Sequence, residues 1–168
     1  MKKFKNSKKV SFLDDIPQTS LDNKDDTLTN RCKFNFSYFD NSQKVGDDFL
    51  DWSQNELSKL FDKLKEFSKF SLKHWENQPI GSGKYRSNVL EIYRAFPSPS
   101  DFKHPKFVPH QAEWARFRLE GKVRFIGFLI PETYHNEAHK GTGIRFDKNT
   151  FYVVFLDKNH LFYKTDRK

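Results

Sequence analysis

Cationic and proton-transferring side chains gather in the last third of the chain. Two strand-like runs, Glu113–Leu119 and Lys122–Ile130, flank a turn, and a third run, Thr150–Leu156, is followed by more polar residues. The side chains concerned are Arg116, Arg118, Arg124, Lys158, His160 and Tyr163. Guanidinium groups hold phosphate, and imidazole transfers protons near neutral pH. On one small sheet, these groups indicate chemistry on an RNA backbone.

Cleavage of RNA beside a 2′-hydroxyl needs a base, a cation for the developing phosphorane charge, and an acid for the departing 5′-oxygen. His160 is the best proton-transfer candidate in the sequence. Arg124 and Arg118 are planar donors suited to the dianionic transition state. Tyr163 can stack on a base or position the 2′-hydroxyl. The scheme requires no metal and no cofactor.

Other groups that could do chemistry are less well placed. The alternative bases are Glu113 and Glu120, and the loop histidines that could line a site are His104 and His110. His135 and His139 are four residues apart, but the sequence offers no obvious third ligand, so we predict no metal site. Plain surface charge is the alternative interpretation of each.

The register of the hairpin decides which arginines meet. A two-residue turn would pair Phe117 with Arg124, whereas a three-residue loop, Glu120–Lys122, would pair Arg118 with Arg124. The second register gives the sheet one mostly apolar face, and such a pattern normally fixes the register. Like charges directly opposite are destabilising, and a bound anion would relieve that cost. The alternative is that the arginines are solubilising charge at a sheet edge.

The elements expected before the hairpin are a strand, a helical segment and a short strand. Cys32–Tyr38 alternates in the manner of a half-buried strand. Asp48–Trp75 has apolar residues at three- and four-residue steps, typical of a long amphipathic helix or a helical hairpin broken near Ser68–Ser71, with Asp47 or Asp48 as its cap. Val89–Phe96 is the short strand. The sequence therefore predicts an α+β domain with an antiparallel C-terminal sheet of three to four strands.

Composition limits the partners and the compartment. The 168 residues fit one domain, residues 31–168, preceded by a flexible arm, residues 1–30, with a basic start and an acidic continuation. The net charge of +8 favours an anionic partner, which is RNA, DNA or an acidic protein. The single Cys32 fits a reducing cytoplasm. No run of about 18 apolar residues suggests a membrane span.

The order strand, helical segment and three strands ending in basic and aromatic residues resembles the RelE/HigB/ParE superfamily of toxin-antitoxin toxins. The segment Trp114–Phe128 is similar to the basic hairpin of that family, and Phe151–Leu156 is similar to its last strand. The resemblance implies an endoribonuclease that cuts messenger RNA at the ribosome and is held by a small acidic antitoxin. It implies catalytic roles for Arg124, His160 and Tyr163. The residues it implies for phosphate binding are Arg116, Arg118, Lys122 and Lys158.

Two segments have no counterpart in this family pattern, the Pro97–Pro109 loop and the Pro131–Lys148 insertion. They bring into question a fit to the ribosomal cleft. Two alternative functions therefore stand beside the ribonuclease. One is a nucleic-acid-binding protein without cleavage, or a ParE-like gyrase poison. The other is a basic module that binds an acidic protein.

Overall fold

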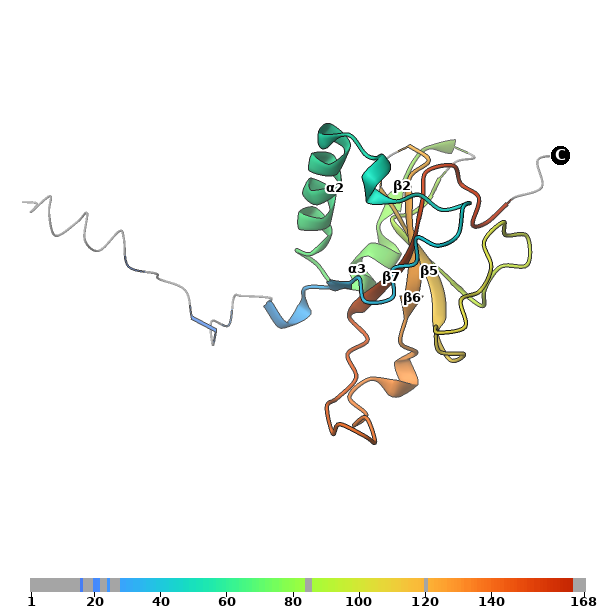
Figure 1. Ribbon diagram of the computed structural model, residues 1–168. Helices are drawn as coiled ribbons and strands as arrows, with labels where there is room; N and C mark the ends of the chain where they lie inside the picture. The colour runs from blue at the N-terminus through green and yellow to red at the C-terminus, as the bar shows by residue number, and fades with distance from the viewer. Residues whose placement is uncertain are drawn as a thin grey trace, which may run out of the picture.

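A five-stranded sheet forms the centre of the protein (Figure 1). The computed structural model describes residues 28–83, 86–119 and 121–164, together with Ile16, Ser20, Leu21 and Lys24. The strands of the sheet, in spatial order, are β1 (Lys33–Asn35), β7 (Thr150–Asp157), β6 (Arg124–Leu129), β5 (Glu113–Arg118) and β4 (Leu90–Arg94). Strands β4 to β7 are antiparallel neighbours, whereas β1 runs parallel to β7. The expected α+β class is thus confirmed, but the sheet has five strands and is mixed.

The β5–β6 hairpin has the register expected from its apolar pattern. Arg118 lies opposite Arg124, and Phe117 lies opposite Phe125. The backbone N–H of Leu119 donates to Val123 O at 3.1 Å and closes the loop. Gly121 has a φ of 53°, a left-handed conformation that glycine adopts without strain.

The helical segment begins later than its apolar spacing suggested and is broken where expected. It consists of α2 (Gln54–Phe67) and α3 (Leu72–Asn77), with Ser68–Ser71 between them. Ser53 caps α2, and Glu56 reaches back to the Ser53 backbone N–H, so the two residues form a capping box. Asp48, one of the two expected caps, precedes only the 3₁₀ turn η2 (Phe49–Asp51) and makes no side-chain capping bond. The signal that fixes the helix start is therefore the Ser53–Glu56 spacing.

The sheet separates two hydrophobic cores. On one face, α2 and α3 cover apolar side chains of the sheet, including Phe117 and Phe125 of the hairpin and Phe151 of β7. On the other face, a long loop between β4 and β5, residues 95–112, and the C-terminal segment 158–164 cover Trp114, Phe155 and their neighbours. Figure 1 shows α2 and this loop on opposite sides of the sheet. We call the second side the outer face.

The first strand is shorter than its alternating sequence suggested. Only Lys33–Asn35 pairs with β7, and Ser37 follows in a turn in which its N–H donates to the Asn35 side chain at 2.9 Å. Phe34 packs with the helix-side core, whereas Tyr38 packs with the outer core. The chain therefore crosses the sheet edge. Phe34 and Tyr38 lie on opposite faces of the sheet, although the alternation in Cys32–Tyr38 predicted that they share one face.

Smaller elements complete the fold. A two-stranded sheet pairs β2 (Pro79–Ile80) with β3 (Ser87–Asn88), and η1 (Leu28–Asn30) precedes β1. The insertion after β6 contains η4 (Glu132–Tyr134) and an isolated bridge between Ala138 and Arg145, and it extends beyond the end of the sheet (Figure 1). Most of the expected arm, residues 1–30, lies outside the described residues.

Candidate functional site

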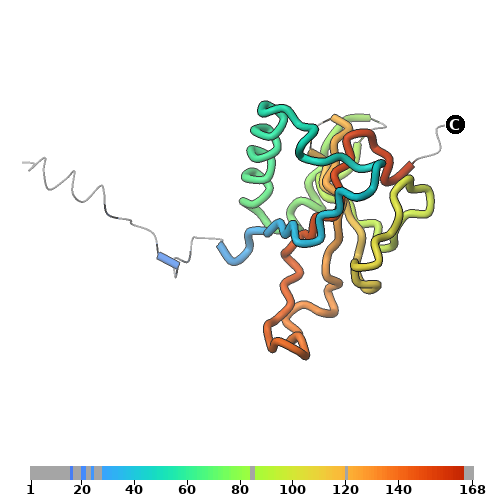
Figure 2. Tube along the Cα trace, viewed as in Figure 1, coloured from blue at the N-terminus to red at the C-terminus, as the bar shows by residue number. Residues whose placement is uncertain are grey.

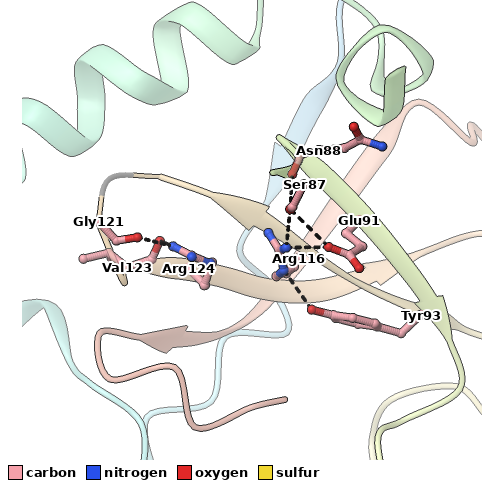
Figure 3. A network of polar contacts seen from close by, with 8 residues as sticks. All are labelled: Ser87, Asn88, Glu91, Tyr93, Arg116, Gly121, Val123 and Arg124. Atoms are coloured by element: carbon pink, nitrogen blue, oxygen red, sulfur yellow. Dashed lines mark hydrogen bonds and ion pairs between the residues drawn. The ribbon is translucent and has the colours of Figure 1, made fainter. Parts of the chain in front are cut away.

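Arg116 is the centre of a polar network on the outer face (Figure 3). Its Nε donates to the Tyr93 hydroxyl at 2.8 Å and its Nη2 to Ser87 Oγ at 2.7 Å. Nη2 also forms an ion pair with Glu91, the residue opposite Arg116 on the edge strand β4. The Arg116 side chain is 9% exposed, whereas that of Glu91 is 44% exposed. The cation is therefore buried and its counter-ion lies at the surface.

Arg124 is the second buried cation of the outer face, and its partners are backbone carbonyls. Its Nη1 donates to Gly121 O at 2.9 Å and to Val123 O at 2.8 Å. Burial, together with the charges of Arg116 and Arg118, lowers the pKa of Arg124 to about 10, so it remains protonated at neutral pH. Arg124 Nε and Arg116 Nη1 are shielded from solvent and have no hydrogen-bond partner among the described residues. Such donors are costly in a protein interior and would be satisfied by an anion.

Asp157 organises the turn that carries His160. Its carboxylate is 1% exposed and accepts backbone N–H groups from Asn159, Leu161 and Phe162 at 2.8–3.1 Å. His160 lies inside this turn with a φ of 61°. A left-handed conformation is unusual for a residue other than glycine, and the Asp157 bonds hold it in place.

His160 belongs electrostatically to the same group as the two arginines. Its imidazole is partly buried, and this burial lowers its pKa below the ordinary value. Arg124 and Arg116 lower the pKa further, and Asp157 opposes them. His160 is therefore mainly neutral at pH 7, the form that accepts a proton.

Tyr163 joins this group through Tyr93. The two rings are stacked with centroids 5.0 Å apart and an interplanar angle of 1°. Tyr93 accepts the Arg116 hydrogen bond, while Tyr163 remains 37% exposed. We call Arg116, Arg124, His160, Tyr93 and Tyr163 the outer cluster.

The other predicted phosphate ligands are not members of the outer cluster, although Arg118 lies opposite Arg124 in the hairpin. Lys158 lies 4.5 Å from the centroid of the Trp52 ring and 3.7 Å from the Glu56 carboxylate, near the start of α2. Lys122 is exposed in the hairpin turn. Arg118 and Lys63 both line a hollow of about 510 Å³ between α2 and the hairpin.

Sequence reasoning missed the residues that position the predicted ones. These are Ser87, Glu91, Tyr93 and Asp157. The burial of Leu90 and the alternation along β4 could have placed Glu91 and Tyr93 on the opposite face, beside the hairpin arginines. The role of Asp157 depends on a turn that no sequence pattern marked.

The described residues contain neither a metal-binding cluster nor a membrane-spanning helix. Within residues 28–83, 86–119 and 121–164, no three His, Cys, Asp or Glu side chains are arranged to hold a metal ion. No helix in the described part of the chain is long and apolar enough to cross a membrane. Comparisons with protein-family models, curated proteins and solved structures found no match to this chain.

Proposed function

We propose that the protein is an endoribonuclease that cleaves RNA without a metal ion, acting in the manner of a RelE-like toxin. The observation that carries the proposal is the convergence of two buried arginines and a histidine of lowered pKa on one face of the sheet. Arg116 Nη1 and Arg124 Nε are buried donors that an RNA phosphate would satisfy. The charge of +8 favours association with such a polyanion.

The proposed reaction uses the neutral imidazole of His160. His160 takes the proton of the 2′-hydroxyl, and the 2′-oxygen attacks the adjacent phosphorus. Arg124 stabilises the added charge of the phosphorane as a fixed cation. The bond from phosphorus to the 5′-oxygen then breaks, and His160 returns its proton to that oxygen. The products are a 2′,3′-cyclic phosphate and a 5′-hydroxyl.

Access to Arg116 requires the Glu91 side chain to move. Glu91 occupies the place that a phosphate oxygen would take, and its 44% exposure on an edge strand permits it to swing into solvent. An RNA phosphate would then exchange one anion for another at Arg116. The burial of the cation makes this exchange favourable only for a group that can accept several hydrogen bonds.

Cleavage of labelled RNA by the purified protein tests this proposal. The assay contains a chelator and is run once with ribosomes and once without them. In at least one of these two conditions, the wild-type protein should yield fragments that end in a 2′,3′-cyclic phosphate. His160→Ala should slow single-turnover cleavage by about 10²–10⁴. His74→Ala, an exposed histidine on α3 at the other face of the sheet, is the control and should cleave normally. A folded wild-type protein that leaves RNA intact in both conditions contradicts the proposal.

A nucleic-acid-binding protein without cleavage is the second candidate, and one observation favours it. Arg116 already has three partners, so it can serve as a fixed part of a binding face without taking part in a reaction. Under this alternative, RNA or DNA would bind with strong salt dependence and remain intact. Induced expression that arrests growth with intact RNA and damaged DNA would favour a ParE-like poison. In either case, co-purification with a small acidic protein would support an antitoxin partner.

A further inference from the structure

The long loop between β4 and β5 presents a cationic surface with an exposed aromatic ring. Residues 95–112 contain one acidic residue, Asp101, which forms an ion pair with Lys164. The exposed residues of the loop that matter here are Lys103, Lys106, Phe107 and His110. Phe107 is 56% exposed, and its nearest ring partner, Tyr38, has its centroid 6.3 Å away.

This loop is held firmly although it has little regular structure. Every third residue from Phe102 is buried, namely Phe102, Pro105 and Val108. The Gln43 side chain bonds both the N–H and the C=O of Lys103 at 2.8 Å. The residues between these anchors therefore keep their outward positions, and the lysines and Phe107 are presented on a fixed backbone.

The loop also adjoins the outer cluster. The N–H of Asp101 donates to Leu161 O at 3.1 Å, and the N–H of Lys164 donates to Pro99 O at 3.0 Å. The segment bonded in this way carries His160 and Tyr163. Figure 2 shows the start of the loop beside the C-terminal segment. A chain that leaves the outer cluster can thus continue onto the loop.

We propose that Lys103, Lys106 and Phe107 form a second contact site for single-stranded RNA. The two lysines would neutralise phosphates, and an unpaired base would stack on the exposed face of Phe107. A duplex could not offer that base, so the surface selects single-stranded RNA or an unpaired region. The choice of RNA rests on the proposed function, whereas the site itself lies outside the outer cluster.

Binding of a 2′-O-methyl oligouridine of 12 nucleotides separates this contact from cleavage, because that probe cannot react. Phe107→Ala should weaken binding about five- to a hundredfold, and Phe107→Trp should bind like the wild type. Phe61→Ala is the matched control, since Phe61 is 68% exposed on α2, and it should change nothing. The Lys103→Ala/Lys106→Ala variant should lower the salt-dependence slope by about 1.4, and Lys65→Ala/Lys69→Ala should leave it unchanged.

The outcomes distinguish this site from the proposed reaction. If the wild type binds the probe through Phe107 but leaves ordinary RNA intact, the site stands and the ribonuclease proposal fails. If RNA is cleaved while Phe107→Ala binds the probe like the wild type, the site is wrong. The absence of binding by the folded wild type also overturns it. Binding of polyglutamate that depends on the lysines but not on Phe107 would instead assign the loop to an acidic protein.

Discussion

The two buried arginines of the outer cluster have different surroundings and should have different effects when removed. Arg116 has three side-chain partners, whereas the hydrogen bonds of Arg124 go to two backbone carbonyls. Removing Arg116 leaves Glu91 without its cation, but Glu91 is half-exposed and can be hydrated. The side-chain donors of Arg124 are less committed to other side chains, which suits a group that binds the reacting phosphate.

We predict that Arg124→Ala costs more activity than Arg116→Ala. Loss of a transition-state donor should slow single-turnover cleavage by about 10²–10³, by analogy with oxyanion-hole deletions. Arg116→Ala should mainly weaken RNA binding and flatten its salt dependence. Circular dichroism of both variants controls for folding. Equal cleavage rates for Arg124→Ala and the wild type would refute the assignment.

The protonation of His160 gives a second prediction at this scale. Because burial and Arg124 lower its pKa, NMR should show the His160 imidazole titrating below 6.5. Arg124→Gln should raise that pKa, since it removes a repelling charge. The unfolded chain binds this proton more readily than the native one, so stability should fall as the pH drops from about 6.5 towards the native pKa. Cleavage should decline over the same acidic range. If the pKa of His160 is normal and does not change in Arg124→Gln, Arg124 has no electrostatic effect on His160 and the prediction is wrong.

Substitution of Asp157 tests whether the C-terminal turn positions His160. Asp157→Asn replaces one acceptor oxygen by an NH₂ group that faces backbone donors, so we expect a loss of about 2–4 kcal/mol in unfolding free energy. The pKa of His160 should also change in the Asp157→Asn variant. Asp101→Asn breaks only an exposed ion pair and should cost less than about 1 kcal/mol. Chemical denaturation gives both values, and equal losses would show that the turn does not depend on Asp157.

At the scale of elements, the capping box explains where α2 begins. Ser53→Ala removes the side-chain acceptor for the Glu56 N–H and should lower the unfolding free energy by about 1 kcal/mol. Ser58→Ala, on the exposed part of the same helix, is the control, and we expect it to be neutral or slightly stabilising. Thermal melts of the two variants measure the difference. If they melt alike, the helix start is determined by packing and not by its cap.

The parts of the fold that could be predicted are those with a local signal. The hairpin register was predictable because only one register keeps Phe117 and Phe125 on a common apolar face. The break between α2 and α3 was marked by Ser68–Ser71. In contrast, the parallel pairing of β1 with β7 joins residues more than a hundred positions apart, and its three residues have no distinguishing pattern.

In the candidate site, too, only the features with a local sequence signal could be predicted. The grouping of Arg124 and Arg116 with His160 could be expected from the hairpin and from the segment that follows β7, whereas their roles stay a prediction. The ring stack of Tyr93 on Tyr163 and the backbone bonds of Asp157 were not, because they depend on how the C-terminal turn folds back over the outer face. Lys158 has the expected residue type, but it contacts Trp52 and Glu56 instead of the outer cluster.

At the scale of the whole molecule, the position of the positive charge matters more than its amount. Positive charge occurs on the outer face, on α2 and, by sequence, in the first nine residues, which contain five lysines. A phosphate backbone bound on the outer face would engage the first of these groups, and the N-terminal lysines could add contacts along it. Lysines on the helix side would contribute only to the general field of the molecule.

Two triple variants with the same charge separate these contributions. Lys2→Ala/Lys3→Ala/Lys5→Ala and Lys59→Ala/Lys65→Ala/Lys69→Ala both lower the net charge from +8 to +5, because each removes three positive charges. The N-terminal variant should lower the salt-dependence slope of single-stranded RNA binding by about 2, at roughly 0.7 per lost phosphate contact. The helix-side variant should leave the slope unchanged. Neither should alter the single-turnover cleavage rate at saturating RNA, because neither removes a residue of the outer cluster. Equal slopes for the two variants would mean that net charge alone governs binding and that the N-terminal lysines make no direct contact.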